Sequence, residues 1–394
     1  MTTGKHKNVL TINGGSSSIK FAVYSLEDNP KRLLHGKIDR IGLATPVLTV
    51  THAQSNKKDS YPVKAPGIRE AAVFLTGWLE KQPEFGHVTA IGHRIVHGMD
   101  HTEAVLITPP LLRELKKISS YDPDHLPGEI QLIETFRKRH PQLPQVACFD
   151  TSFHTGMPRV ASMLPIPRRF YEAGIKRYGF HGLSYSYIME ELARIDKNTA
   201  NERIIIAHLG NGASMAAVKA GKSIDTSMGF TPAGGLMMGT RPGDLDPGVA
   251  WYMMQKEAMT PGQFNEVINH QSGLLGVSGS SPDMQDLLEK ESTDIKAKEA
   301  IDLFCYQVKK WIGSFTAVLG GLDALVFTGG IGENAPVIRS RICAGLQFLG
   351  IEVDEKRNEQ HETAIAEYNS TVPVYVIPAN EELMIAKTTI KLQY

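Results

Sequence analysis

The first segment whose residue types suggest chemistry lies close to the N-terminus. Asn13-Gly-Gly-Ser-Ser-Ser-Ile-Lys20 follows the apolar run 9–12 and precedes a second apolar run. Paired glycines let the backbone approach a ligand, and serine hydroxyls with a lysine suit a phosphate group. Asn13 offers an oxygen of the kind that Mg²⁺ prefers. The pattern predicts an anion-binding β-hairpin, with an ordinary serine-rich turn as the alternative reading.

Two arginines stand where a side chain of that size needs an anionic partner. Arg94 lies in the mostly apolar, strand-like run 88–98, and its partner is either structural or a ligand. Arg241 lies in the Gly-rich segment 238–244, where little can pack against it, so a ligand role is favoured. His93 and His97 have the spacing of a helical zinc pair, but the strand-like context and the missing glutamate argue against zinc.

Two further side chains end a strand or open a helix. Asp150 follows the buried strand 145–149, at the position where α/β proteins place chemistry. His181 stands between two glycines, just before the expected helix 184–195.

The elements that position these residues form a repeated pattern. The run 204–218 again reads strand, Gly-rich turn, strand, as the first hairpin does. Strand 324–327 leads into Gly329–Asn334 and a helix from 336, which suits a nucleotide phosphate. The repetition predicts a duplicated α/β domain with a nucleotide cleft between the copies.

Other elements follow from apolar periodicity and helix-capping residues. We expect helices at 66–82, 110–118, 127–140 and 294–319, with Asp246 as an N-cap and 51–60 as an exposed loop. A closing helix after Glu382 should return to the first domain.

Composition narrows the class of protein. A chain of 394 residues is too long for one typical core, so two domains are expected. The 42 basic and 42 acidic residues balance, which argues against a nucleic-acid or anionic membrane partner. Three widely spaced cysteines suit a reducing compartment. No secretory signal or run of about 18 apolar residues is visible, so a cytoplasmic protein is expected.

Nine segments, in order and over nearly the whole chain, resemble the acetate and propionate kinase family. They are Asn13–Lys20, Gly92–Gly98, Phe149–His154, Arg177–Gly182, His208–Gly212, Asp225–Pro232, Gly239–Asp244, Gly329–Asn334 and Asn380–Leu383.

The resemblance implies two duplicated ribonuclease-H-like α/β domains, as in actin, the Hsp70 ATPase domain and sugar kinases. It places the N-terminal domain at 1–150 plus 383–394, and the C-terminal domain, with most of the nucleotide site, at 151–382. It implies reversible, Mg²⁺-dependent (or Mn²⁺-dependent) in-line transfer from ATP to acetate, giving acetyl phosphate and ADP, by a homodimer that pairs through the second domain.

The resemblance also implies roles for individual residues. The catalytic positions are Asp150, His181, Arg241 and Arg94, and the metal positions are Asn13 and Glu381. The substrate-binding positions are Arg94, Val96, His125, Phe180 and Pro232. The nucleotide positions are Lys20, Ser16, Ser18, His208, Gly210, Asn211, Gly212, Asp283, Met284, Gln285, Gly330, Ile331, Gly332 and Asn334.

Three details refine this picture. Because a carboxylate acceptor is already ionised near neutral pH, Asp150 is expected to orient Arg94 or a metal-bound water rather than act as a base. Asp124 stands where the family carries an apolar residue. It either faces solvent or pairs with His125 or an arginine. Gln285 replaces an arginine near the adenine site.

Rival functions remain open at this point. A propionate or other short-chain carboxylate kinase would differ in its preferred acid. A chaperone or cytoskeletal ATPase would need a peptide-binding or polymerising region, and a sugar kinase would need a catalytic aspartate that activates a hydroxyl.

Overall fold

The computed structural model describes residues 7–15, 17–53, 55 and 57–393. The chain forms two compact units: unit 1 is Met1–Ser152 with Asn380–Tyr394, and unit 2 is Phe153–Ala379. The sequence placed Asn380–Glu382 in the second domain, whereas this division puts them in the first. Contacts within unit 1 explain the difference, because the Tyr24 hydroxyl donates to Asn380 Oδ1 at 3.4 Å and Asn13 Nδ2 donates to Glu381 Oε2 at 2.8 Å.

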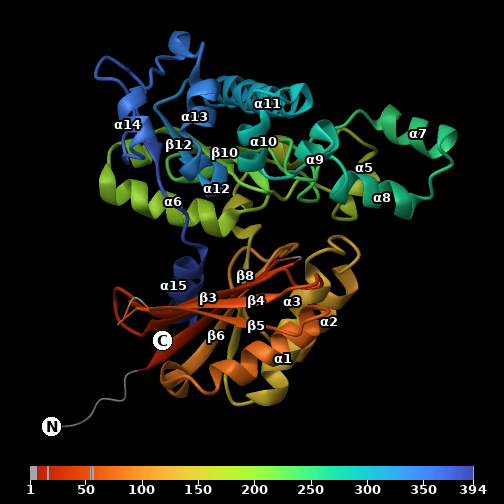
Figure 1. The fold of residues 1–394 in the computed structure, drawn as a ribbon, viewed down its shortest axis with the longest axis vertical. Helices are drawn as coiled ribbons and strands as arrows, with labels where there is room; N and C mark the ends of the chain where they lie inside the picture. Colours follow the sequence, from red (N-terminus) through yellow and green to blue (C-terminus); the bar gives the residue numbers. More distant parts are fainter. Residues whose placement is uncertain (1–6, 16, 54, 56, 394) are drawn as a thin grey trace. The chain divides into compact units, whose positions relative to one another are not determined.

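The described part of unit 1 contains one eight-stranded sheet, in the order β5-β4-β3-β2-β1-β6-β8-β7 (Figure 1). Its strands are β1 (Asn8–Gly14), β2 (Ile19–Ser25), β3 (Arg32–Asp39), β4 (Val47–His52), β5 (Lys57–Pro62), β6 (Val88–Ile95), β7 (Val105–Leu106) and β8 (Gln145–Phe149). Strands β1 to β5 form an antiparallel meander, and β6 and β8 run parallel to β1. The predicted hairpin is confirmed, since Asn13 lies opposite Lys20.

The prediction of an exposed loop at 51–60 is wrong. Most of that segment belongs to β4 and β5, which pair from Val47 opposite Pro62 to His52 opposite Lys57. β5 is the edge strand of the sheet and its residues are mostly polar, so the sequence lacks the apolar alternation that marks a strand there.

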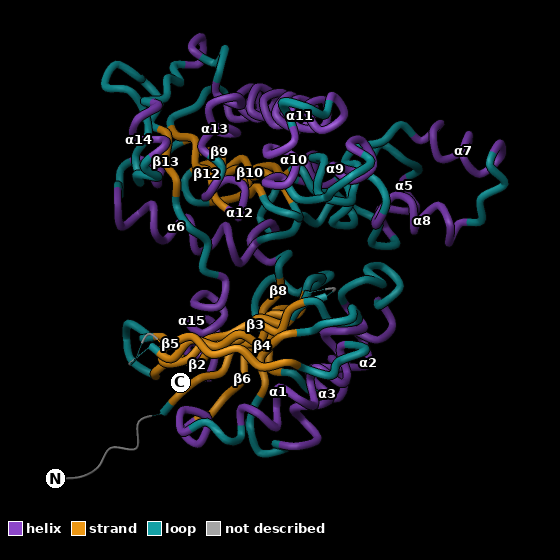
Figure 2. The backbone as a smooth tube through the Cα atoms, viewed as in Figure 1, coloured by secondary structure: helices purple, strands orange, loops and turns teal. Residues whose placement is uncertain are grey.

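Helices cover both faces of this sheet (Figure 2). They are α1 (Ile68–Leu79), α2 (Pro109–Ile118), α3 (Leu126–Arg139) and α15 (Glu381–Gln393), with the short 3-10 helix η1 (Pro83–His87). Leu75 and Phe136 join the core formed with Phe21, Leu10 and Leu34 on one face. On the other face Ala386 packs with Ala22 and Tyr24. The predicted helices 110–118 and 127–140 are confirmed to within a residue at each end.

The described part of unit 2 contains a five-stranded sheet, in the order β11-β10-β9-β12-β13. Its strands are β9 (Arg203–Leu209), β10 (Ala213–Lys219), β11 (Lys222–Thr226), β12 (Ala324–Thr328) and β13 (Val374–Val376). As in unit 1, an antiparallel meander is extended on the side of its first strand by two parallel strands. This shared order agrees with the predicted duplication of an α/β domain.

Helices of unit 2 surround this sheet and extend beyond it. They are α4 (Arg159–Ser162), α5 (Arg168–Glu172), α6 (Gly182–Ile195), α7 (Pro247–Lys256), α8 (Pro261–His270), α9 (Gly273–Ser278), α10 (Met284–Lys290), α11 (Ile295–Leu319), α12 (Gly329–Asn334), α13 (Pro336–Cys343) and α14 (Glu355–Glu359), with 3-10 helices η3 (Thr199–Asn201) and η4 (Gln347–Leu349). Ile188 and Leu192 pack with Ile204, Ile206 and Val326 in one core.

Capping residues explain where several of these helices begin. Asp294 accepts hydrogen bonds from the Lys296 and Ala297 amides and opens α11, which ends at Gly320 with a φ of 74°. Asp246 accepts from the Gly248 amide with a proline at the first helical position, so its predicted capping role is confirmed. Among the described residues, no helix combines the length and the apolar character needed to cross a membrane.

Candidate active site

Arg94 is the centre of the candidate site in unit 1. It lies on β6 opposite Cys148 of β8, and Asp150 follows β8 directly. Its Nε donates to Asp150 Oδ2 at 2.8 Å, and its Nη2 lies 2.6 Å from the same oxygen. Its Nη1 donates to the Gly14 carbonyl at 3.1 Å. The structure therefore supplies the anionic partner that the buried arginine requires, and it brings Arg94 and Asp150 together.

Glu129 is a part of this site that the sequence analysis missed. Both of its carboxyl oxygens accept from the Val96 amide, at 3.2 and 3.0 Å, and Oε1 lies 3.6 Å from Arg94 Nη1. Glu129 is 3% exposed, in the first turn of α3. A glutamate just after the proline of a predicted helix was the available signal, but acidic residues are common in first turns and are usually solvated there.

The Arg94 guanidinium interacts electrostatically with several carboxyl groups in the buried part of this site. Burial opposes the charge of Arg94, but Asp150, Glu129 and Glu381 raise its pKa, so it stays charged. Burial raises the pKa of Glu129 to about 8, although Arg94 and the Val96 amide act against it. Burial also raises the pKa of Asp150, against Arg94, which is its direct partner. Because Asp150 holds Arg94 more closely than Glu129 does, Glu129 is the carboxyl that keeps a proton near neutral pH.

Asn13 and two glutamates form a cluster of oxygen ligands at the end of β1. Asn13 Nδ2 donates to Glu381 Oε2 at 2.8 Å and to Glu382 Oε1 at 3.3 Å. No group of three His, Cys, Asp or Glu side chains fit to hold a metal occurs in the described residues. Two carboxylates and an amide suit Mg²⁺, which keeps several waters and phosphate oxygens in its shell. The residues therefore fit the expected cation.

The loop between β1 and β2 carries the predicted phosphate ligands. Lys20 is exposed on β2, and the Gly15 amide donates to the Ser18 carbonyl at 2.8 Å across the turn. Ser16 lies outside the described residues. A side chain at Gly14 would place its Cβ 2.8 Å from Leu132 Cδ1 of α3, so the end of that leucine side chain would have to shift.

Val96 and His125 are the acyl-site residues predicted in unit 1. Val96 is 1% exposed, and its amide is bound to Glu129. The His125 ring Nδ1 lies 2.8 Å from Oδ1 of Asp122, which is buried, and that oxygen also accepts from the His125 amide at 3.0 Å. Burial acts to raise the pKa of Asp122, but the hydrogen bonds from His125 outweigh it and lower the pKa. The aspartate seen on His125 is thus Asp122, and Asp124 is half-buried.

His181 is the centre of the candidate site in unit 2. It precedes α6 in the left-handed conformation, with φ 58°. Its Nδ1 lies 2.8 Å from the Ser214 hydroxyl, and its ring stacks on His208 with centroids 4.3 Å apart. Left-handed backbone at a residue other than glycine is uncommon and clusters at functional sites. The two imidazole rings therefore lie in direct contact, one against the other.

Arg241 and Gly212 lie beside His181. Arg241 Nη1 donates to the Pro232 carbonyl at 2.6 Å. A Cβ built at Gly212 would lie 2.9 Å from Arg241 Nη2 and 3.5 Å from His181 Nε2. The Gly-rich turn after β9 therefore passes close to the Arg241 guanidinium and the His181 imidazole. Phe180 is buried next to His181, and its carbonyl lies 3.0 Å from the His154 ring Nε2.

The predicted nucleotide segments gather around the same turn. His208 Nδ1 lies 2.8 Å from the Ser184 hydroxyl. A Cβ at Gly210 would lie 3.6 Å from the Gly330 amide, and one at Gly239 would lie 1.9 Å from Asn211 Oδ1. Gly330 itself has open space where a side chain would stand. Small residues therefore leave backbone groups accessible here, as phosphate binding requires.

Residues 329–334 differ from the expected turn, because they form the short helix α12. A glycine at 329, with φ 78°, lets the chain pass within van der Waals distance of Leu209. Glu333 Oε1 accepts from the Gly329 amide at 2.9 Å, and Asn334 Nδ2 donates to the Gly330 carbonyl at 2.9 Å. Ile331 and Gly332 lie between them in the same helix. The helix predicted from 336 is present as α13, which begins at Pro336 directly after α12.

Residues 283–285, which were predicted to lie near the adenine of the nucleotide, also make contacts that stabilise the fold. Asp283 caps α10 by accepting from the Gln285 and Asp286 amides. Met284 is 4% exposed, so it belongs to the core. The side chain of Gln285 is exposed and donates to Glu289 Oε1 at 3.2 Å. The Pro282 carbonyl would lie 3.1 Å from a Cβ at Gly239, which places this segment next to Asn211.

Comparison with known proteins agrees with this arrangement. Residues 8–387 match the model of the acetokinase family. The chain is 43% identical over 391 residues to an acetate kinase of Nitrobacter hamburgensis, covering 98% of this chain and 96% of that protein. An acetate kinase of Oceanobacillus iheyensis is 41% identical, with 98% of both chains covered.

Solved structures point the same way. A propionate kinase from Francisella tularensis superimposes with a TM-score of 0.91 at 37% identity, covering 98% of this chain and 99% of that one. An acetate kinase from Porphyromonas gingivalis gives a TM-score of 0.87 at 35% identity, covering 98% and 100%. The resemblance predicted from nine sequence segments is therefore confirmed, and the chain belongs to the acetokinase family.

Proposed function

We propose that this protein transfers a phosphoryl group reversibly between ATP and acetate, forming acetyl phosphate and ADP. The observation that carries this proposal is the similarity, over 98% of the chain, to proteins named acetate kinase. The two groups of side chains described above support it, because each contains a positive charge suited to a phosphoryl or carboxylate group.

In unit 1, Arg94 provides a fixed cation. A loose phosphoryl-transfer transition state spreads negative charge over three equatorial oxygens, and prearranged donors stabilise that charge. The Asp150 carboxylate holds the Arg94 guanidinium in place through Nε and Nη2. We assign Asp150 as a positioning group, because acetate needs no base to ionise it near neutral pH.

In unit 2, His181 and Arg241 provide the second set of donors. Ser214 fixes the His181 ring through Nδ1, which leaves Nε2 facing the turn at Gly212. We assign His181 and Arg241 to stabilising the transferring phosphoryl group. Backbone groups of Gly210–Gly212 and Gly330–Asn334 are assigned to the nucleotide, with His208, Asp283, Met284 and Gln285 nearby. Phe180 and Pro232 are assigned to the acyl side, with Val96 and His125.

Asn13 and Glu381 are the residues we assign to Mg²⁺ or Mn²⁺, with Lys20 and Ser18 as phosphate contacts. The cation would supply charge neutralisation at the phosphate oxygens. The Asn13 amide donates to both Glu381 and Glu382, so the three side chains lie next to one another.

We also propose a homodimer formed through unit 2. Helix α7 has no buried residue among those described, and Trp251 and Tyr252 on it are 68% and 59% exposed. Large exposed aromatic side chains are enriched at protein interfaces. Helix α8 lies beside α7 in the same part of the unit (Figure 1). A cytoplasmic location is supported by Cys148, Cys305 and Cys343, which are all free and buried.

The direct test is an acyl-hydroxamate assay with ATP and Mg²⁺ across formate, acetate, propionate and butyrate. We expect the highest kcat/KM for acetate. The alternative is a propionate or other short-chain carboxylate kinase, with which the structural similarity to a propionate kinase is compatible. A higher kcat/KM for propionate would establish that alternative, and no acyl phosphate with any acid would overturn both.

A further inference from the structure

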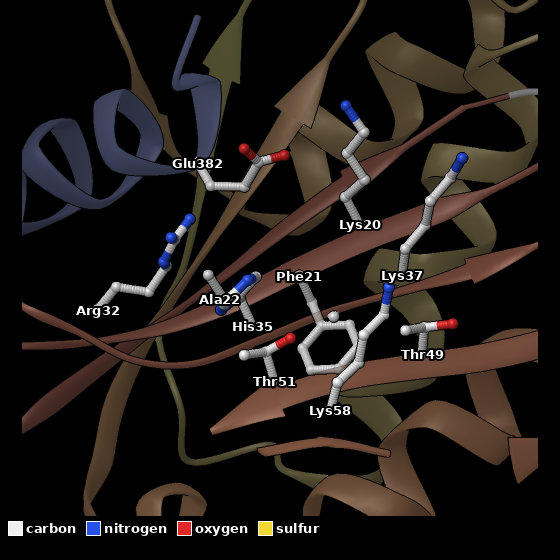
Figure 3. A pocket seen from close by; sticks show the side chains of 11 residues that line it. Lys20, Phe21, Ala22, Arg32, His35, Lys37, Thr49, Thr51, Lys58 and Glu382 are labelled. Carbon is white, nitrogen blue, oxygen red and sulfur yellow. The ribbon is translucent and has the colours of Figure 1, made fainter. Parts of the chain in front are cut away.

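One face of the unit 1 sheet carries a pocket that the proposed reaction does not use in full. It has a volume of about 290 Å³ and lies over β2, β3, β4 and β5, with Glu382 at one side (Figure 3). Four of its lining residues are cationic: Lys20, Arg32, Lys37 and Lys58. Of these, only Lys20 belongs to the candidate active site.

Strand register brings these side chains together in two rows. Lys20 lies opposite Lys37, which lies opposite Thr49. In the next row Ala22 lies opposite His35, His35 opposite Thr51, and Thr51 opposite Lys58. Residues directly opposite one another in neighbouring strands share a face of the sheet. Figure 3 shows the side chains of Lys20, Lys37 and Lys58 rising from this common face.

The positive charge of this face is poorly compensated. Lys37 pairs with Asp39 at 2.8 Å. Lys20, Arg32 and Lys58 have no ion pair among the described residues, and Glu382 is the one acidic side chain that lines the pocket there. Like charges directly opposite on neighbouring strands are destabilising. The pairing of Lys20 with Lys37 is therefore a cost that a bound anion would remove.

His35 adds a second, independent observation. Its Nδ1 is buried and has no hydrogen-bond partner among the described residues. Burial lowers the pKa of His35, and the nearby charge of Arg32 lowers it further. A buried polar atom without a partner is uncommon in native structures. The neutral ring can supply one N–H donor to an anion in the pocket.

We propose that this pocket is an anion site that binds a chain of linked phosphates. The cationic side chains span β2 to β5, and neighbouring strands lie about 4.8 Å apart. One phosphate could reach only part of this span, whereas several linked phosphates can meet Lys20 and Lys37 at one end and Lys58 at the other. Thr49 and Thr51 offer hydroxyl donors between them. The phosphates come either from an inorganic oligophosphate or from the tail of a nucleotide.

The chain itself offers a matched pair of variants for a test. Lys58 lines the pocket, while Lys57 is its neighbour on β5 and points to the opposite face, since successive side chains of a strand alternate. That opposite face carries Tyr61, whose ring lies 6.2 Å from Trp78 of α1. Both lysines are exposed, so Lys58→Gln and Lys57→Gln remove the same charge from the same strand without touching the core.

The experiment is calorimetric titration of the intact protein with tripolyphosphate, inorganic phosphate and ATP at fixed ionic strength. We expect tripolyphosphate to bind more tightly than phosphate. Lys58→Gln should raise the Kd for tripolyphosphate at least tenfold, whereas Lys57→Gln should change this Kd by less than twofold. A second ATP-binding event that only Lys58→Gln removes would identify a nucleotide tail, and its absence would identify inorganic oligophosphate. Acyl-phosphate formation should be unchanged in both variants. Equal binding by the two variants, or no binding of tripolyphosphate, would overturn the proposal and leave the kinase assignment untouched.

Discussion

The Arg94 guanidinium and the Asp150 carboxylate form a buried ion pair, with Nη2 and Oδ2 2.6 Å apart. Nε donates to the same oxygen at 2.8 Å, and Nη1 is held by the Gly14 carbonyl at 3.1 Å. All three guanidinium nitrogens are thus engaged by fixed partners. The orientation of Arg94 is set before any substrate arrives, and it depends on the planar shape of the group.

Arg94→Lys and Arg241→Lys should each lower kcat by two to three orders of magnitude, although the charge is kept. A lysine cannot reproduce the forked contacts, and losing one prearranged donor costs about 3–4 kcal/mol of barrier. Steady-state kinetics with acetate and ATP measure the effect. Arg341→Lys is the control, because Arg341 pairs with Glu291 on another part of unit 2 and should keep full activity. Near-normal kcat in either site variant would show that its fork is dispensable.

Glu129→Gln should change the pH dependence of stability. The pKa of Glu129 is about 8 in the folded protein, against an ordinary value of 4.5. Between these values the unfolded chain has lost the proton that the folded chain retains. Glu129 therefore makes the folded state less stable as pH rises through this window, by up to about 1.4 kcal/mol per pH unit.

Glutamine cannot ionise, so the variant should gain stability relative to wild type between pH 5 and pH 8. Urea unfolding of both proteins at several pH values measures this difference. A constant difference across the range would mean that Glu129 is ionised in the folded protein throughout.

Glu381→Ala should raise the Mg²⁺ concentration needed for half-maximal activity more than Glu382→Ala does. Asn13 Nδ2 lies 2.8 Å from Glu381 and 3.3 Å from Glu382, so the first carboxylate is the more closely tied to Asn13. Titration of activity with Mg²⁺ gives the comparison. Coincident curves for the two variants would contradict the assignment of Glu381.

Gly239→Ala should raise KM for ATP while leaving the melting temperature nearly unchanged. The new Cβ would stand 1.9 Å from Asn211 Oδ1, so that side chain must move out of its place beside Gly210 and Gly212. Gly313→Ala is the matched control, because nothing lies within 4 Å of a Cβ there. If the two variants had equal KM values for ATP, Asn211 would have no part in nucleotide binding.

Asp124→Leu should change KM for acetate by less than threefold, on the order of 0.65 kcal/mol. Asp122, rather than Asp124, is the aspartate whose contact with His125 is 2.8 Å. Asp122→Asn should therefore affect activity more, since it removes the charge that orients this ring. A tenfold fall in KM with Asp124→Leu would place the Asp124 carboxylate against the substrate.

Much of the fold followed from local sequence patterns. The hairpins at Gly14 and Gly210, the capped helix after Asp294 and the strand before Asp150 all combine apolar periodicity with residues that favour turns or caps. The edge strand β5 did not follow, because its residues are mostly polar and its pairing with β4 is visible only across the hairpin. In such an edge strand, long-range contacts decide the structure.

The site was predictable where a residue type is itself unusual in its context, as with Arg94 on an apolar strand. Glu129 was missed because nothing local distinguishes it from a solvated residue of a first helical turn. Its function depends on Val96 and Arg94, which are distant in the sequence. The contact between Asp122 and His125 was not predicted, because Asp124 is the aspartate adjacent to His125 in the sequence.

The return of the chain to unit 1 at Asn380 has a consequence for biosynthesis. The ribosome delivers β1 first and α15 last, so the sheet of unit 1 waits for its second helical cover until synthesis is nearly complete. During that interval the apolar side of Ala22 and Tyr24 has no Ala386 to pack against. Because Glu381 arrives on this helix, a nascent or truncated chain that lacks the last segment also lacks one of the two residues that we propose for Mg²⁺. The last helix therefore completes the packing of unit 1 and brings in Glu381 at the same stage of synthesis.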